Sequence, residues 1–206
     1  MGLIEQLEWR YATKKFDDQR NISKDDLDLL KKTFALTATS YGLQPLKLVV
    51  VTDKKVQEQL VAHSYGQKQV GQASALFVIC TEQSIDAAFV ENYFARVEEV
   101  RGTPTEVLAP FKKHLMENFI TKPKEQLTLW ASKQAYIALG NLLTACALHH
   151  LDSCPMEGFD SLKVKSLLNL NKKSEINMII GCGIRLKEGV YGERFRIPFE
   201  EVYIQK

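Results

Sequence analysis

One long helical segment without a polar face constrains the fold of this chain more than any other feature. A helix is predicted from about Lys124 to His150, and its second half, residues 135–148, is apolar nearly all round. A membrane span needs about 20 apolar residues, and this stretch is shorter and interrupted, so we expect no membrane insertion. A helix that is apolar on every side has to be buried on every side, either in a core or between subunits.

Shorter elements on both sides of this helix predict an α+β fold. Ser23 followed by Asp26 indicates the start of one helix, and Asp53 indicates the start of another that runs to about His63. Further helices are predicted at about 3–9, at 84–120 with a break at 102–104, and at 160–170; strands are predicted at 46–52, 75–81, 176–184 and 201–204. Helices outnumber the strands, which favours a central sheet flanked by helices.

Composition narrows the class of protein further. The 206 residues are predicted to form one domain over 1–206, which is large enough to bury a core without disulfides or metal. A net charge of +2 gives no reason to expect nucleic acid as a partner, so any anion site has to come from a local cluster of cations. The four cysteines show no CxxC spacing and the first residues do not form a secretory signal, so a cytoplasmic protein is expected. The four histidines lack the spacing of metal ligands, and no metal site is expected.

Two local clusters of cations could form such an anion site. Arg10, Lys14 and Lys15 lie within six residues, directly after the first predicted helix. Arg194 and Arg196 lie near the C-terminus, where alternation along an extended backbone would place both on one side. Guanidinium groups on one face suit bidentate contacts with phosphate oxygens. The alternatives are solvated surface charge for the first cluster and a charge-protected edge strand for the second.

Three connecting segments offer uncharged hydrogen-bonding groups. In residues 154–160, the pair Glu157-Gly158 would let backbone N–H groups approach a flat ligand, because glycine has no side chain in the way. A simple connector between two helices is the alternative for this segment. Residues 39–45 and 65–70 lead into predicted strands, where ligands often bind. Each segment alone is a weak indication.

Taken together and in this order, the segments resemble the FMN-dependent nitroreductase and flavin reductase family. The resemblance covers nearly the whole chain, and its most specific part is Gln134–Asn141 followed by Cys154–Asp160. The other matching segments are Arg10–Asp17, Ser40–Pro45, Gly66–Val70 with Ala73-Ser74, and Arg194–Arg196. The resemblance implies a nitroreductase-like α+β fold with a central mixed sheet of about four to five strands. It also implies an intertwined homodimer that buries the apolar helix between its subunits and has its flavin sites at the interface.

The resemblance implies roles for individual residues. Arg10, Lys14, Arg194 and Arg196 would surround the FMN phosphate and ribityl end, and Lys14 would also lie near the N1/C2 edge of the ring. Backbone N–H groups around Glu157 and Gly158 would face flavin N5. Gln67 and Gln69 would contact the pyrimidine edge of the ring. The partner subunit would contribute Thr39, Ser40 and Gly42. The complete expected set is Arg10, Tyr11, Ala12, Thr13, Lys14, Thr39, Ser40, Gly42, Gln44, Gln67, Gln69, Pro155, Met156, Glu157, Gly158, Arg194 and Arg196.

The implied activity is a two-electron transfer in two half-reactions. NADH or NADPH would reduce the flavin and leave, and a small flat acceptor such as a nitroaromatic, a quinone or a flavin would then bind in the same place. The cofactor carries the chemistry, so no side-chain acid or nucleophile is expected. Lys14 would support the reaction because reduced flavin carries negative charge near N1.

Three positions depart from the family pattern. Ala12 replaces a serine whose hydroxyl often reaches the phosphate, which costs on the order of 1 kcal/mol. Gly66 stands where many relatives have asparagine, and Leu46 replaces a tryptophan. Two other functions stay open: a flavin-binding redox sensor or storage protein with little turnover, and a reductive enzyme for a specialised substrate that uses residues 102–125 as a lid.

Overall fold

The computed structural model describes residues 2–205, and its centre is a four-stranded sheet. The strands are β1 (Leu46–Val51), β2 (Ala75–Glu82), β3 (Asp152–Met156) and β4 (Ser174–Gly183), in the spatial order β1-β2-β4-β3. All three ladders are antiparallel. The two central strands, β2 and β4, are buried along most of their length, as their continuous apolar runs predict.

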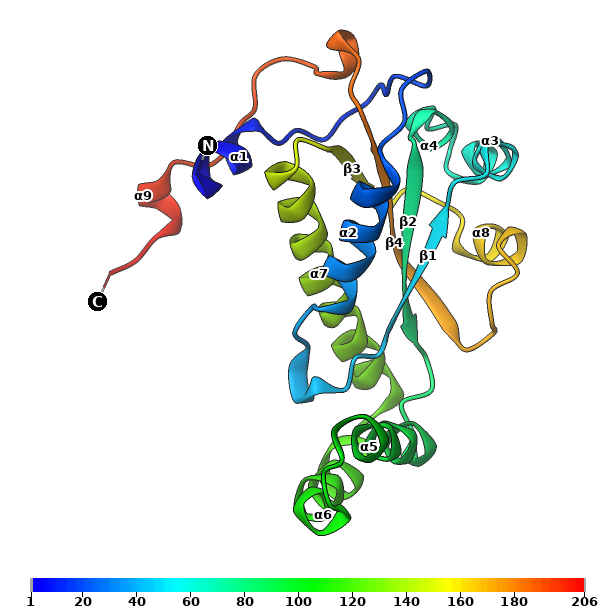
Figure 1. Cartoon of the computed structure of the whole chain (residues 1–206), viewed down its shortest axis with the longest axis vertical. Coiled ribbons are helices and arrows are strands. Elements are labelled where there is room, and N and C mark those ends of the chain that lie inside the picture. Colours follow the sequence, from blue (N-terminus) through cyan, green and yellow to red (C-terminus); the bar gives the residue numbers. More distant parts are fainter. Residues whose placement is uncertain (1, 206) are drawn as a thin grey trace.

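Helices cover both faces of the sheet (Figure 1). On one face lie α2 (Lys24–Ala35) and the long α7 (Lys124–Leu148); on the other lie α3 (Lys54–His63), α4 (Gln69–Gln72) and α8 (Ser161–Leu167). Successive residues of a strand point to opposite faces, so each central strand contributes to two cores. Phe77 and Ile180 pack in the core beneath α2 and α7, whereas Leu76 and Ile179 pack in the opposite core.

A helical lobe extends from the N-terminal end of α7 (Figure 1). It consists of α5 (Ala87–Arg101), α6 (Thr105–His114) and a π-helical turn, η2 (Leu115–Phe119). The predicted break at 102–104 is confirmed: Gly102 adopts a left-handed conformation with φ of 64° and ends α5. The lobe has its own apolar cluster, which includes Phe94, Leu115 and Phe119.

The predicted helix starts are confirmed by their capping contacts. The Ser23 hydroxyl accepts a hydrogen bond from the backbone N–H of Asp26, and the Asp26 carboxylate accepts one from the backbone N–H of Ser23. Asp53 accepts hydrogen bonds from the first backbone N–H groups of α3. The predicted helix at 3–9 is α1 (Leu3–Trp9).

Two predictions about strands are wrong, and one strand was not predicted. The sheet is antiparallel in every ladder among residues 2–205, not mixed. Residues 154–160 are not only a connector, because their first part belongs to β3; Pro155 is tolerated there since β3 lies at the edge of the sheet. The predicted strand at 201–204 is instead α9 (Phe199–Val202), which begins after Pro198 and has two glutamates in its first turn.

The apolar part of α7 is buried on only part of its circumference within one subunit. Ala138 and Leu142 lie in the core under the sheet, with almost no exposed surface. Tyr136 and Ile137, by contrast, are 46% and 47% exposed. The expectation that this helix is buried on every side is therefore not met by a single chain.

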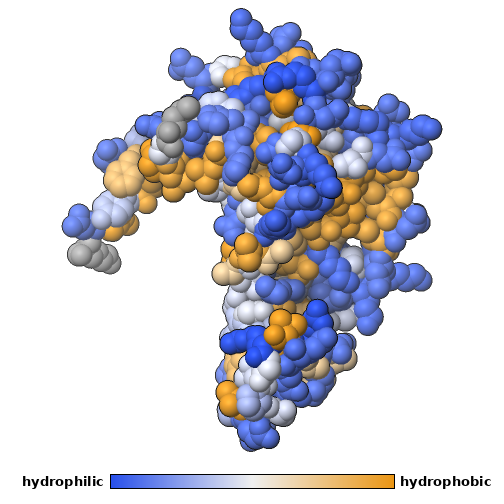
Figure 2. Space-filling view, viewed as in Figure 1, coloured by the Kyte–Doolittle hydropathy of each residue, from blue (hydrophilic) through white to orange (hydrophobic). Residues whose placement is uncertain are grey.

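The C-terminal arm (residues 190–205) leaves the body of the molecule after a short 3₁₀ turn, η3 (Lys187–Gly189), and ends far from it (Figure 1). Many of its apolar side chains are exposed, namely Tyr191, Phe195, Ile197, Phe199, Val202, Tyr203 and Ile204. Figure 2 shows apolar residues along the arm and a hollow between the arm and the body. Within the part of the chain described, no helix is both long and apolar enough to cross a membrane.

Candidate functional site

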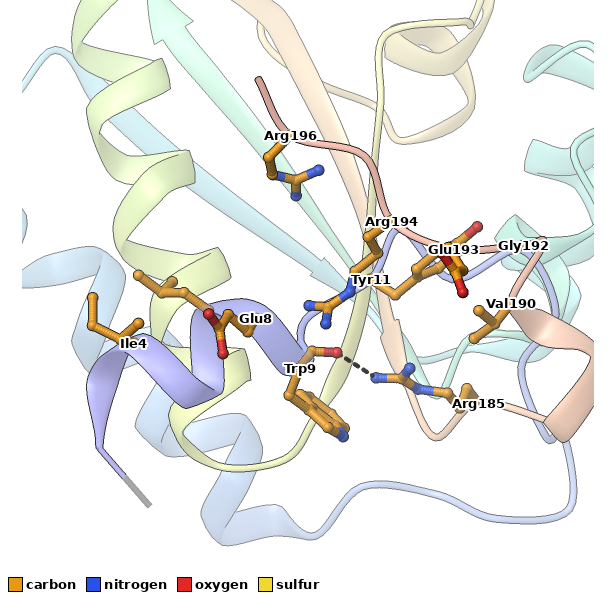
Figure 3. A pocket seen from close by; sticks show the side chains of 11 residues that line it. Ile4, Glu8, Trp9, Tyr11, Arg185, Val190, Gly192, Glu193, Arg194 and Arg196 are labelled. Atoms are coloured by element: carbon orange, nitrogen blue, oxygen red, sulfur yellow. Dashed lines mark hydrogen bonds between the residues drawn. The ribbon is translucent and has the colours of Figure 1, made fainter. Parts of the chain in front are cut away.

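The two ends of the chain meet in one pocket. A cavity of about 240 Å³ is lined by Arg10, Tyr11, Ala12, Lys14, Glu193, Arg194, Phe195 and Arg196. It adjoins a larger cavity of about 870 Å³ between α1 and the C-terminal arm, which Tyr11, Arg194 and Arg196 also line (Figure 3). The Arg194 guanidinium donates a hydrogen bond to the Arg10 carbonyl at 3.3 Å, although the two residues are 184 positions apart in the sequence. The two predicted cation clusters therefore converge.

The surroundings of Arg10 are those expected of a residue that binds an anion. Its side chain is half-buried, and its Nη1 atom is buried without a hydrogen-bond partner in the described chain. Burial, followed by the positive charges of Arg196 and Arg194, lowers the pKa of Arg10. A buried donor without an acceptor is costly. A phosphate in this pocket would supply that acceptor and offset the repulsion between the three guanidinium groups, so the residues present fit this group.

Lys14 connects the pocket to the edge strand β3. Its ammonium group lies 3.7 Å from the Cys154 sulfur. Burial raises the pKa of the Cys154 thiol, while Lys14 lowers it. The backbone around Lys14 is also fixed, because the N–H of Thr13 donates to the Ser153 carbonyl at 3.2 Å and that of Lys14 donates to the Gly189 carbonyl at 3.0 Å. Lys14 therefore lies between the cation pocket and the predicted ring-binding residues that follow Cys154.

Asp152 and Arg185 hold this arrangement together, and sequence reasoning missed both. The Asp152 carboxylate is 4% exposed and accepts hydrogen bonds from the Thr13 hydroxyl at 3.3 Å, from the Arg185 backbone N–H at 2.8 Å, and from the Arg185 guanidinium. The same guanidinium donates to the Trp9 carbonyl at 3.4 Å (dashed line, Figure 3) and lies over the Trp9 ring. The sequence offered two signals for these residues: an acidic residue soon after the long helix and a single arginine after β4.

The Thr13 hydroxyl accordingly points into the protein. The side chain is fully buried and donates to Asp152, so it does not line the cation pocket. The Thr13 backbone N–H is also occupied by the Ser153 carbonyl, so the structure does not place this predicted site residue in the pocket. Ala12 does line the pocket, as does Tyr11, whose hydroxyl donates to the Tyr191 carbonyl at 2.7 Å and so ties the C-terminal arm to the N-terminal segment.

The predicted ring-binding residues meet at the turn after β3. The Gln67 amide donates to the Gly158 carbonyl at 2.7 Å, and the Gln69 amide donates to the Gln67 side-chain oxygen at 3.1 Å. A Cβ atom at Gly158 would lie 3.2 Å from the Gln67 amide nitrogen, so a larger residue would have to push the Gln67 side chain back by a few tenths of an ångström. Among residues 2–205, no acceptor receives a hydrogen bond from the backbone N–H of Glu157 or Gly158. Two successive amides are therefore available to a ligand.

Thr39, Ser40, Gly42 and Gln44 lie apart from these residues. They precede β1, at the opposite edge of the sheet from β3, and line neither of the two cavities. Their segment is held by α7, because the Gln134 side-chain oxygen accepts the Ser40 backbone N–H at 2.9 Å. A single chain thus brings together the cation pocket and the Gln67–Gly158 turn, but it leaves the 39–44 segment elsewhere.

No cluster of three or more histidine, cysteine, aspartate or glutamate side chains within residues 2–205 is placed to hold a metal ion. The four cysteines are buried as free thiols, and Cys146 and Cys182 have their sulfur atoms 3.8 Å apart. The candidate site is therefore built from cations, amides and backbone N–H groups.

Comparison with known proteins places this chain in a family. The sequence pattern of the nitroreductase family matches residues 7–184. A Staphylococcus epidermidis protein provisionally named as an NAD(P)H nitroreductase is 34% identical over 200 residues, which cover 93% of this chain and 91% of the relative. A Staphylococcus aureus protein with the same provisional name is 32% identical and covers 90% of this chain and 87% of its own length.

Solved structures show the same fold. A provisionally named nitroreductase from Bacillus subtilis superimposes with a TM-score of 0.87 at 22% identity, covering 98% of both chains. A nitroreductase from Exiguobacterium sibiricum, also provisionally named and solved in complex with FMN, superimposes with a TM-score of 0.84 at 18% identity and covers 100% of this chain and 98% of its own. The family pattern and the curated relatives span nearly the whole chain, and this chain belongs to the nitroreductase family.

Proposed function

We propose that this chain is an FMN-dependent NAD(P)H oxidoreductase and that residues 1–206 form a single FMN-binding domain. The observation that carries the proposal is the convergence of Arg10, Arg194 and Arg196 from opposite ends of the chain around a buried donor with no partner. The provisional names of the relatives support the NAD(P)H part, and the FMN complex of the Exiguobacterium sibiricum protein supports the flavin part. The four free thiols fit the reducing cytoplasm as its location.

The chain offers a separate group of residues for each end of FMN. Arg10, Arg194 and Arg196 would bind the phosphate, whose charge of about −2 these cations and Lys14 would more than neutralise. Tyr11 and Ala12 would line the path of the ribityl chain. The Gln67–Gln69 pair, the segment Pro155–Gly158 and Lys14 would surround the ring. These roles are proposals for the residues named, and each contact can be tested by substitution.

The flavin would supply the redox chemistry by accepting a hydride from NAD(P)H and passing two electrons to an acceptor. The protein would orient both partners and stabilise charge. The Lys14 ammonium would stabilise negative charge that develops at the N1 side of the ring, which favours two-electron over one-electron transfer. Nitroaromatics, quinones and free flavins are the proposed acceptors, and they would bind in place of the nicotinamide, so the two half-reactions would alternate.

An absorbance spectrum tests this function directly. We expect the purified protein to be yellow, with flavin bands that bleach within seconds of mixing with NADH or NADPH and return when a quinone or a nitroaromatic is added. The reason is that the donor and the acceptor use the same open face of one cofactor. A yellow protein that both nicotinamides leave unchanged would point instead to flavin storage or sensing, and a protein that cannot be loaded with FMN would refute the proposal.

We further propose that the active form is an intertwined homodimer. In one chain, Tyr136 and Ile137 leave an apolar face of α7 exposed, and the C-terminal arm carries exposed apolar side chains with little of the body beneath them. Burying these surfaces against a second copy would remove the exposed apolar area from water. The 39–44 segment, which lies away from the cation pocket, would then complete the site of the partner subunit.

A charge on the exposed face of α7 should separate the subunits. We expect the wild-type protein to sediment as a dimer, and Ile137→Glu to shift it towards the monomer at micromolar concentration, because a carboxylate would have to be buried without a partner. Sedimentation velocity measures this directly. The control is Leu162→Glu, an exposed leucine on α8 at the opposite face of the sheet, which should leave the dimer intact. A stable folded monomer for the wild-type protein would contradict the assembly.

A further inference from the structure

The turn that would face the flavin ring is held from the side of α7 by one hydroxyl group. The Tyr136 side chain donates a hydrogen bond to the Glu157 carboxylate, 21 residues further along the chain. Both side chains are exposed, and neither is needed for the apolar core. This contact therefore connects the long helix to the turn without contributing to the hydrophobic packing beneath it.

Other contacts fix the same turn from its remaining sides. Gln67 donates to the Gly158 carbonyl at 2.7 Å, the Phe159 backbone N–H donates to the Glu157 carbonyl at 3.0 Å, and the Asp160 backbone N–H donates to the His63 carbonyl at 2.8 Å. The carbonyl groups of Glu157 and Gly158 are thus occupied, whereas their backbone N–H groups donate to no acceptor in the described chain. The Gly158 N–H lies in the same peptide plane as the Glu157 carbonyl, and the Glu157 N–H lies in the plane of the carbonyl of Met156, the last residue of β3, so both amides have a defined direction.

The Tyr136 hydroxyl keeps its proton and can therefore always donate a hydrogen bond. Its hydrogen bond to Glu157, then burial, then the negative charge of Glu157 raise the pKa of Tyr136 above its ordinary value. The phenol therefore keeps its proton throughout the pH range in which the protein would work. A protonated phenol next to an ionised carboxylate forms a charge-assisted hydrogen bond, which is stronger than a neutral one.

We propose that Tyr136 is a positioning residue for the flavin: by donating to the Glu157 carboxylate, it aims the amides of Glu157 and Gly158 at the N5 edge of oxidised FMN. This inference rests on the proposed function. Oxidised flavin presents a lone pair at N5 that accepts a hydrogen bond, whereas in reduced flavin the same nitrogen carries a hydrogen. Amides aimed at N5 therefore favour the oxidised form, and hydrogen bonds to ring nitrogens are a recognised way to tune a flavin.

The test compares the binding of oxidised and reduced FMN to the apoprotein. Tyr136→Phe keeps the ring and removes the hydroxyl, and we expect the dissociation constant for oxidised FMN to rise roughly threefold to tenfold, the contribution of one hydrogen bond. The constant for reduced FMN should change less than twofold, so the midpoint potential of the bound flavin should rise. A merely structural role for Tyr136 would weaken both forms equally.

Variants of Glu157 test the same contact from the exposed side. Glu157→Gln retains a side-chain oxygen that can accept from Tyr136 but loses the charge assistance, so it should lie between the wild type and Glu157→Ala, whereas Glu157→Ala should behave like Tyr136→Phe. The double variant Tyr136→Phe/Glu157→Ala should show no further loss, because both changes remove one interaction.

The outcomes separate this inference from the function on which it rests. If the wild-type protein binds FMN and Tyr136→Phe leaves the ratio of the two dissociation constants unchanged, the positioning role is overturned and the function stands. Equal weakening of both forms, or a Glu157→Gln variant as impaired as Glu157→Ala, overturns it as well. If the wild-type protein binds no FMN in either form, the proposed function fails first and this inference fails with it.

Discussion

Replacing Arg10 by alanine is expected to weaken FMN binding by about 1.5–3 kcal/mol, because each hydrogen bond to a charged phosphate oxygen contributes that much. Arg10 is half-buried, and one of its donor atoms has no hydrogen-bond partner among the described residues. The loss of binding free energy for Arg10→Ala should therefore lie near the upper end of this range. Arg196→Ala should act in the same direction but nearer the lower end, since Arg196 is exposed and water screens its charge. Fluorescence titration of the apoprotein with FMN measures both values.

The matched control is Arg101→Ala, which removes an exposed arginine at the end of α5, in the helical lobe away from the cation pocket. We expect this variant to bind FMN like the wild type. Riboflavin provides a second control because it lacks the phosphate, so its binding should be insensitive to Arg10→Ala. Unchanged retention of FMN in both Arg10→Ala and Arg196→Ala would refute the proposed phosphate site.

Asp152→Ala is expected to have the largest effect on stability. Asp152 is nearly fully buried and accepts hydrogen bonds from Thr13 and from two donors of Arg185, whose side chain is itself largely buried. Removing one partner of a buried ion pair leaves the other charge uncompensated and typically costs about 3–5 kcal/mol. Because about a fifth of the Arg185 side chain remains in contact with water, we expect the lower end, about 3 kcal/mol. Urea denaturation of the apoprotein measures this free energy of unfolding.

Asp28→Ala is the control for Asp152→Ala. Asp28 forms an ion pair with Lys31 at 2.9 Å on the exposed surface of α2, where such pairs contribute little. We expect a large loss in the free energy of unfolding for Asp152→Ala and a small loss for Asp28→Ala. Similar losses in the two variants would show that Asp152 does not hold the N-terminal segment in place.

Much of this fold could be predicted because local signals agreed with the tertiary structure. Ser23 and Asp53 cap helices, Gly102 ends one, and the apolar runs of β2 and β4 form the buried centre of the sheet. Strand β3 could not be predicted in this way, because Pro155 argues against a strand unless its position at the edge is already known. The valine, tyrosine and isoleucine near the C-terminus favoured a strand, whereas Phe199–Val202 form the short helix α9.

The residues of the candidate site were likewise predicted only in part. The cations at the two ends of the chain and the Glu157-Gly158 pair are visible in the sequence, and the structure brings Arg10 and Lys14 together with Arg194 and Arg196. Asp152, Arg185 and Tyr136 were not found, since their importance comes from contacts with residues far away in the chain. The expected site residues also included Thr13, whereas tertiary folding buries it and turns its hydroxyl towards Asp152.

The central claim is that cations from both ends of the polypeptide bind one phosphate group, and the ratio of the dissociation constants for riboflavin and FMN tests it most directly. Two or more charged hydrogen bonds are lost when the phosphate is absent, so riboflavin should bind at least roughly a hundredfold more weakly than FMN at low ionic strength. Equal affinity of the wild-type protein for riboflavin and FMN would contradict the claim.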